Sequence, residues 1–197
     1  ADNSSNLSIF AALGMYTLTV IAGLLLLIFV FYPLLVHLFT RIQTKHFIRS
    51  MYPVQLLAFT TSSSAATLPL NMETTERDLG ISKEITSFVL PVGTTINMDG
   101  TSIMQGVAVV FIAQAYGIPL TMGNLATVVV TATLASIGTA GVPSVGLVTL
   151  AMVLNSVGLP TEGIALIMGI DRILDMIRTA VNITGDAVCT TIVCHQE

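Results

Sequence analysis

Charged residues and tryptophan are what this sequence most clearly lacks. Lys, Arg, Asp and Glu make up 9% of the chain, Trp is absent, and no charged residue occurs between Asp99 and Glu162. Seven Lys and Arg against eleven Asp and Glu are too few to form a surface for nucleic acid, so we exclude that partner. The 53% hydrophobic content is typical of a membrane protein rather than a soluble one.

Soft metal ligands are also scarce. Cys189 and Cys194 are five residues apart, a spacing that fits neither a C-x-x-C redox pair nor a zinc site. The histidines at 37, 46 and 195 are scattered, so we expect no transition metal. The chain starts ADNSSNLS, without Met or the features of a signal peptide, and we interpret it as part of a longer protein.

The first long apolar segment covers residues 7–40. More than thirty apolar positions suffice to cross about 30 Å of hydrocarbon, so we predict a full transmembrane helix here. Arg41, Lys45, His46 and Arg49 follow it, and the positive-inside tendency places this loop in the cytoplasm.

The segment 50–71 has two short apolar arms around TTSSSAATLP. Each arm has only about ten residues, too few to span a bilayer at 1.5 Å per residue, which favours a re-entrant hairpin. Arg77 and Lys83 follow, and a hairpin returns them to the same side as Arg41.

The segment 85–116 is apolar but is interrupted by PVGTTINMDGT. This motif contains a proline and two glycines, which are poor in a helix interior, together with the polar residues Asn97 and Asp99. We predict a broken helix, because unwound backbone is tolerated at membrane depth only where protein or a water-filled cavity surrounds it.

A second hairpin is predicted over residues 121–157, with SIGTAGVPSVG at its tip. Its features repeat those of the first at a spacing of 74 residues, pairing Ser62 with Ser136, Pro69 with Pro143, and Asn97 with Asp171. If the two hairpins enter from opposite sides they form inverted repeats, which place solute and ion sites at their interface near the midplane.

The last apolar segment contains a polar stripe. At about 100° per residue its polar residues share an arc of roughly 100°. They are Asp171, Asp175, Arg178, Thr179, Asn182 and Asp186. Charges at bilayer depth are costly, so such residues face a cavity, pair with each other, or bind an ion or solute.

Each motif also has a structural interpretation. The small-residue tips can be close helix contacts, the Asn97 and Asp99 kink can be a structural hydrogen-bond network, and Asp175 with Arg178 can be an intrahelical ion pair. Their joint occurrence favours a binding site. Arg178 offers a planar fork for a carboxylate and Asp175 accepts from an ammonium group, so the predicted solute is a small acidic zwitterion. Unwound carbonyls and side-chain oxygens suit a hard alkali cation.

These motifs resemble one known family. TSSSAATLP at 61–69, INMDGT at 96–101, LASIGTAGVP at 134–143 and GIDRILDMIRTAVNITGD at 169–186 closely resemble the dicarboxylate/amino acid:cation symporters. This family includes archaeal aspartate transporters and mammalian excitatory amino acid transporters. The similarity covers essentially the whole chain and corresponds to the family's C-terminal half.

The resemblance implies an all-α integral membrane fold with transmembrane helices, two re-entrant helical hairpins and a broken helix in an inverted-repeat transport domain. Residues 1–49 would form a transmembrane helix and a basic loop, 50–120 the first hairpin and the broken helix, and 121–197 the second hairpin and the final helix. It further implies a multi-pass plasma-membrane transporter rather than an enzyme. That transporter would be a homotrimer moving like an elevator against a scaffold that this chain lacks.

The resemblance also assigns roles to residues. Arg178, with Thr101 nearby, would meet the substrate's side-chain carboxylate, and Asp175 its amino group. The other predicted substrate residues are Asn182 for the main-chain carboxylate, Thr179 beside it, and backbone groups of Ser62, Ser64, Val142 and Gly146. Residues 138–146 would form the extracellular gate.

Sodium ions are the implied cofactors, at three sites. The first would use Gly93, Asn97, Asn182 and Asp186. The second would use Thr95, Ser136, Ile137 and Thr139. The third would use Asn97 and Asp99 with groups from the absent half.

Some positions depart from the family pattern. Accessory arginines that archaeal and animal members carry are replaced by Ser62 and Met176, and Arg172 lies at the edge of the polar arc. Gln105 stands where animal members have a proton-carrying Glu, which argues against that kind of proton coupling. Arg178 favours an acidic substrate, because neutral amino acid members lack this arginine.

Three other functions compete with sodium-coupled transport of aspartate or glutamate. A proton-coupled C4-dicarboxylate symporter of the same fold is the alternative, with Asp175 protonated or idle. An intramembrane aspartyl protease would need two carboxylates on facing helices, such as Asp99 and Asp171, but no G-x-G-D motif is present. A passive ion pathway would not need hairpins that occlude a solute.

Overall fold

The computed structural model describes residues 3–137 and 140–196, and this part is built of helices without any strand. Helix α1 (Asn3–Leu26) continues through one π-helical turn, η1 (Leu27–Phe31), into α2 (Tyr32–Phe39). The stretch Phe10–Phe39 is long and apolar enough to cross a membrane, as predicted from residues 7–40. Arg41 lies in the turn after α2.

The first hairpin pairs α3 (Thr44–Thr61) with α4 (Ser64–Arg77), and its tip consists of Ser62 and Ser63. The prediction of arms of about ten residues was wrong, because the arms have 18 and 14 residues. The helices extend into the polar sequences on both sides, and Phe47 in the added part of α3 is buried in the core. Most of TTSSSAATLP is also helical, and Pro69 lies inside α4.

The broken helix is confirmed, but the break is narrower than the motif suggested. Helix α5 (Lys83–Ile96) and helix α6 (Asp99–Ala115) are separated by Asn97 and Met98 alone. Pro91 lies within α5, so the proline and the glycines around it do not interrupt the helix. The stretch Lys83–Ala115 is the second that is long and apolar enough to span a membrane.

The second hairpin pairs α7 (Met122–Ser136) with α8 (Val145–Ser156). A 3-10 turn, η2 (Thr161–Gly163), leads into α9 (Ile164–Gln196), a continuous helix of 33 residues. Both hairpins of the predicted repeat are present, and each is followed by a helix that carries polar residues. The helix after the first hairpin breaks at Asn97, whereas α9 does not break at Asp171.

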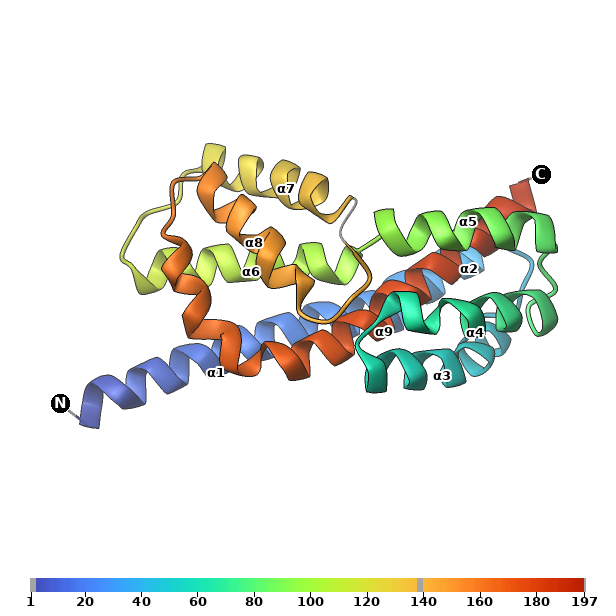
Figure 1. Cartoon of the computed structure of the whole chain (residues 1–197), viewed down its shortest axis with the longest axis horizontal. Helices are drawn as coiled ribbons and strands as arrows, with labels where there is room; N and C mark the ends of the chain where they lie inside the picture. Colours follow the sequence, from blue (N-terminus) through green and yellow to red (C-terminus); the bar gives the residue numbers. More distant parts are fainter. Residues whose placement is uncertain (1–2, 138–139, 197) are drawn as a thin grey trace.

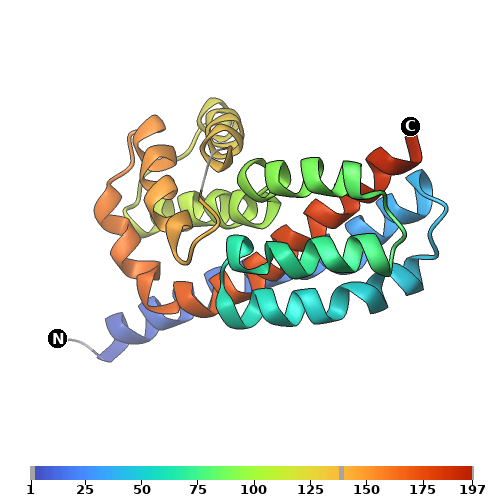
Figure 2. The same cartoon turned by 45° about the vertical axis from the view of Figure 1, so that its right-hand side comes forward.

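The two hairpins approach each other from opposite ends of the molecule. In Figure 1, α3, α4 and α5 occupy one half and α6, α7 and α8 the other, while α9 and the continuous stretch from α1 to α2 run through both. Figure 2 shows the same division from another side. Ser63 Oγ donates to the Gly141 carbonyl at 2.8 Å and Ala65 N donates to it at 3.2 Å, so the tips are in contact. The helix break and both tips therefore meet at the middle of the molecule.

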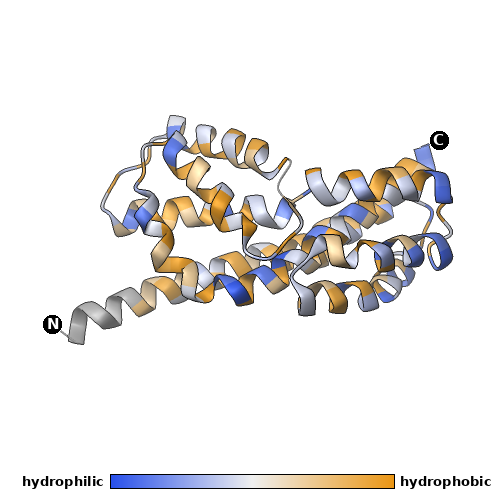
Figure 3. Cartoon of the chain, in the orientation of Figure 1, coloured by the Kyte–Doolittle hydropathy of each residue, from blue (hydrophilic) through white to orange (hydrophobic). Residues whose placement is uncertain are grey.

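Many large apolar side chains are exposed, and Figure 3 shows that apolar residues occur along all the helices. Met122 is 81% exposed, and Phe10 and Phe88 are each 71% exposed. Five of the seven basic residues lie at one end, from the turn after α2 to the start of α5: Arg41, Lys45, Arg49, Arg77 and Lys83. The interior of the half that contains α6, α7 and α8 is apolar. Its fully buried residues include Leu24, Met104, Ile112, Leu150 and Leu154.

Candidate solute and cation site

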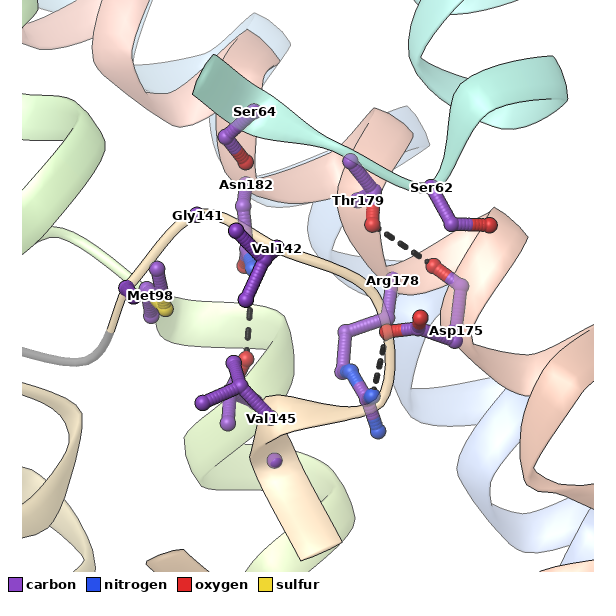
Figure 4. A pocket seen from close by; sticks show the side chains of 13 residues that line it. Ser62, Ser64, Met98, Gly141, Val142, Val145, Asp175, Arg178, Thr179 and Asn182 are labelled. Carbon is purple, nitrogen blue, oxygen red and sulfur yellow. Dashed lines mark hydrogen bonds and ion pairs between the residues drawn. The ribbon is translucent and has the colours of Figure 1, made fainter. Parts of the chain in front are cut away.

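A small pocket lies where the two hairpin tips meet the break between α5 and α6 and the middle of α9. Figure 4 shows α9 side chains facing the two tips across this space. All nine predicted substrate residues line it: Ser62, Ser64, Thr101, Val142, Gly146, Asp175, Arg178, Thr179 and Asn182. The stripe predicted on α9 is confirmed, since its six polar residues are all at most 5% exposed.

Both tips contain a serine with left-handed backbone geometry. Ser62 ends α3 with φ +52° and Ser144 precedes α8 with φ +60°. Residues other than glycine adopt this region at a cost and do so most often at functional sites. Ser63 caps α4 by accepting from Ala66 N, and Ser64, the first residue of this helix, lines the pocket. The tips thus present backbone polar groups to a solute.

Arg178 is 2% exposed and is neutralised by two carboxylates of its own helix. Its Nη2 donates to Asp175 Oδ1 and its Nη1 to Asp171 Oδ1 at 3.4 Å. The other Asp175 oxygen accepts from Ser144 N at 2.9 Å, which connects α9 to the second tip. The intrahelical pair considered from the sequence is therefore present, and both partners also line the pocket.

Asn182 connects α9 to the start of α6. Its Oδ1 accepts from Gly100 N at 2.8 Å and its Nδ2 donates to Thr101 Oγ1 at 3.2 Å. A Cβ at Gly100 would lie 3.0 Å from that same Oδ1, so glycine permits this close approach. The carboxamide thereby fixes Thr101, the residue predicted beside the substrate.

Three of the four residues predicted for the first sodium site lie together. Asn97 Nδ2 donates to Asp186 Oδ1 at 3.0 Å, and a Cβ at Gly93 would approach the same oxygen to 2.9 Å. Asn182 lies one helical turn before Asp186. Asp186 is 1% exposed and its Oδ2 has no hydrogen-bond partner among the described residues. A buried carboxylate oxygen without a partner among the described residues is a ligand that fits a sodium ion.

The other two predicted cation sites are less complete. Ser136 Oγ donates to Thr133 O and Thr95 Oγ1 to Val92 O, while the Ile137 side chain is 48% exposed. Thr139 lies outside the described residues, so the second site stays a prediction. At the third, Asp99 Oδ2 accepts from Tyr32 Oη of α2 at 3.0 Å, and the site as a whole stays a prediction.

Sequence reasoning gave Tyr32 no role. This tyrosine comes directly after the π-helical turn, a feature frequent at functional sites, and a Cβ at Gly185 would lie 2.5 Å from its hydroxyl. In the sequence it is one aromatic residue in a long apolar run, and only a tertiary contact reveals its part. Pocket positions that the prediction omitted are Met98, Ala140, Gly141 and Val145.

The positions that depart from the family pattern supply no second guanidinium to the pocket. Arg172 is exposed on α9, and Met176 does not line the pocket. Gln105 is fully buried and its Nε2 donates to Thr149 Oγ1 of α8 at 2.7 Å. Gln105 therefore joins α6 to the second hairpin as a neutral donor.

Helices broken near the middle of the molecule, around buried charged side chains, are typical of the solute sites of secondary transporters. The chain belongs to the sodium:dicarboxylate symporter family, whose profile matches residues 3–196. It is 49% identical to excitatory amino acid transporter 2 of Mus musculus over 183 residues, which are 93% of this chain and 32% of that protein. It is 49% identical to excitatory amino acid transporter 1 of Rattus norvegicus and 46% identical to an excitatory amino acid transporter of Caenorhabditis elegans, each over 93% of this chain. The chain spans 34% and 36% of those two proteins, about a third of each relative's length.

Proposed function

We propose that this chain forms the solute- and cation-binding part of a sodium-coupled symporter of acidic amino acids. The observation that supports this most directly is Arg178, a buried guanidinium that lines the pocket between the two hairpin tips. No other basic side chain lines that pocket among the residues described. A planar, permanently charged fork is the group best suited to a carboxylate.

Binding exchanges one set of ion pairs for another. Without solute, Arg178 is held by Asp171 and Asp175. A carboxylate of the solute takes over the Arg178 fork, and Asp175, released from it, accepts from the solute's ammonium group. Each charged group keeps a partner, so the site avoids the penalty of an unpaired buried charge in either state. Asp171 remains beside Arg178 and holds it in orientation.

Charge balance supplies the reason for coupling to a cation. Asp99, Asp171, Asp175 and Asp186 with Arg178 give this region a formal charge of −3. An acidic amino acid adds one more negative charge, and at low dielectric such accumulation is strongly unfavourable. Sodium ions at Asp186 and Asp99 offset it. Asn182 lies one turn from both Arg178 and Asp186, so solute and cation each order the other's site.

The remaining parts of the proposal concern the whole protein. We place it in the plasma membrane as a multi-pass protein, with the basic end of Figure 1 in the cytoplasm, because five of seven basic residues lie there. The hairpins are then re-entrant, since three of their four arms have only 12 to 15 residues and are shorter than a full span. Family membership supports a homotrimer with elevator motion against a scaffold outside this chain.

The proton-coupled dicarboxylate symporter is less well supported. This alternative gives Asp175 no role in binding. The Asp175 carboxylate nevertheless lines the pocket and contacts both Arg178 and the second tip. The relatives from mouse, rat and Caenorhabditis elegans are also named as amino acid transporters.

Uptake into proteoliposomes tests the proposal. The protein is reconstituted, and radiolabelled L-aspartate, L-glutamate and succinate are presented with either an inward sodium gradient or an inward proton gradient. We expect accumulation of an amino acid driven by sodium alone. Accumulation of succinate driven by protons without sodium would establish the alternative instead.

A further inference from the structure

Helix α4 is buried through polar side chains alone. Its buried residues share one face and are Ser64, Thr67, Asn71, Thr74 and Thr75. A helix in a protein interior normally buries an apolar stripe, and this one turns a polar stripe towards α5 and α9. Ser64 belongs to the pocket between the tips, but the stripe continues from there to the basic end of the molecule.

Four polar atoms along this interior have no hydrogen-bond partner within the described part of the chain. They are Asn71 Oδ1, Thr75 Oγ1, Thr86 Oγ1 and Asp186 Oδ2, and each of these residues is at most 1% exposed. Buried polar groups are almost always hydrogen-bonded to protein or to ordered water. Four unpaired atoms on three adjoining helices therefore indicate bound water or an ion rather than a dry interior.

Other buried threonines in the same region do not share this feature. Thr67, Thr94 and Thr190 each donate to the carbonyl four residues earlier, at 2.7 to 2.9 Å. Local bonds of this kind satisfy a hydroxyl without any solvent. Thr75 and Thr86 lack such a bond, so their hydroxyls remain available to another partner.

The four atoms lie on three helices, α4, α5 and α9, that pack against one another. Asn71 Nδ2 donates to the Ile183 carbonyl at 3.1 Å, which places Asn71 beside the α9 segment that contains Asp186. Thr75 is one turn, about 6 Å, further along α4. Helix α4 ends at Arg77, and the loop after it folds back so that Ile81 N donates to the Thr75 carbonyl at 3.2 Å. Thr86, early in α5, comes after this loop.

We propose that α4, α5 and α9 enclose a narrow hydrated column, defined by Asn71, Thr75, Thr86 and Asp186. The column connects the Asp186 carboxylate with the basic end of the molecule and is closed there by the buried side chains of Leu79 and Ile81. The column contains water, and a hard monovalent cation exchanges with this water. This route is distinct from the pocket between the hairpin tips, which receives the solute.

The column brings water into contact with the cation at Asp186. A cation enclosed by protein leaves only as fast as water replaces its ligands, and water already held at Asp186 Oδ2 supplies that replacement. The cation part of this inference rests on the proposed function, whereas the hydration part does not.

Silver-ion labelling tests the column in the reconstituted protein. Ag⁺ is monovalent, small and thiol-reactive, so it probes a path that larger reagents cannot enter. In a background with Cys189→Ser and Cys194→Ser, we compare Thr75→Cys and Thr86→Cys with Val54→Cys. Val54 is also fully buried but belongs to the apolar core. Mass spectrometry after alkylation in denaturant measures the thiol that Ag⁺ has occupied.

We expect Thr75→Cys and Thr86→Cys to react with Ag⁺ at least about tenfold faster than Val54→Cys. A tenfold difference in rate corresponds to the free energy of about one hydrogen bond to water along the path. Equal rates at all three positions would overturn the column. Sodium, compared with choline, slows the reaction if a cation occupies the column. Rates that sodium leaves unchanged would overturn the cation part and leave a column of water alone.

Thermal unfolding of hydroxyl-to-methyl variants gives an independent test. Thr75→Val and Thr86→Val keep the side-chain shape and remove the hydroxyl. If water is bound, each variant removes one hydrogen-bond partner of that water, and the midpoint of thermal unfolding falls by roughly 2–4 °C. A rise in the midpoint would show that the hydroxyls were dry and would contradict the proposal. Fast Ag⁺ reaction without sodium-dependent aspartate binding would instead refute the proposed function and retain the hydrated column.

Discussion

Replacement of Arg178 by threonine is the most informative single perturbation of this site. Arg178 is 2% exposed and pairs with Asp171 and Asp175, which are 3% and 4% exposed. The variant removes the guanidinium that we propose receives the solute carboxylate. It also leaves two buried carboxylates without a cation. The effects on binding and on folding therefore have to be measured separately.

The two effects have predictable sizes. Truncating one partner of a buried, hydrogen-bonded charge pair costs about 2–5 kcal/mol in binding, which lowers L-aspartate affinity from about 30-fold to several thousand-fold. Breaking the internal pairs costs about 3–5 kcal/mol of folding free energy. Isothermal titration with L-aspartate and with L-serine in sodium measures the first effect, and denaturant unfolding measures the second.

A double variant separates folding from recognition. Arg178→Thr combined with Asp171→Asn removes one of the orphaned charges, so we expect part of the stability to return while L-aspartate binding stays lost. Arg178→Lys keeps the charge but not the planar fork, and we expect intermediate affinity. Binding of L-aspartate by Arg178→Thr within about threefold of the unmodified protein would refute the role assigned to this residue, because threefold is well below the smallest loss predicted.

Distances in the site support three further predictions. Asp186→Asn should weaken apparent sodium affinity at least about tenfold, as measured by sodium titration at fixed L-aspartate. The sodium-saturated variant should still bind L-aspartate. Unchanged sodium affinity would contradict the cation site. Gly93→Ala should have a similar effect in the same titration, because its Cβ would approach Asp186 Oδ1 to 2.9 Å. Ser63→Ala removes the bond to Gly141 O and the cap of α4, so we expect denaturant unfolding to show a loss of about 1–2 kcal/mol in unfolding free energy.

The parts of the fold that could be predicted depend on local periodicity. The polar stripe on α9 is evident from the spacing of Asp171 to Asp186, and its burial is expected because charges avoid lipid. Asn97 and Asp99 in an apolar segment located the helix break to within a few residues. Pro69 and Pro91 were weaker guides, since both are accommodated inside helices.

The features that could not be predicted depend on contacts between distant segments. The bond between Tyr32 and Asp99 joins residues 67 positions apart, and no local pattern marks Tyr32. The lengths of the hairpin arms were underestimated because polar helix ends do not differ from loops in hydrophobicity. That both hairpin tips meet at Gly141 likewise depends on tertiary packing, although the small residues of each tip were recognised in sequence.

Calorimetric binding of L-aspartate to the purified protein, in sodium and then in choline at the same pH, tests the central claim most directly. We expect saturable binding in sodium and none in choline, because the negative charges around Arg178 must be offset before an acidic solute can enter. Binding of equal strength in choline would contradict the coupling of solute to cation.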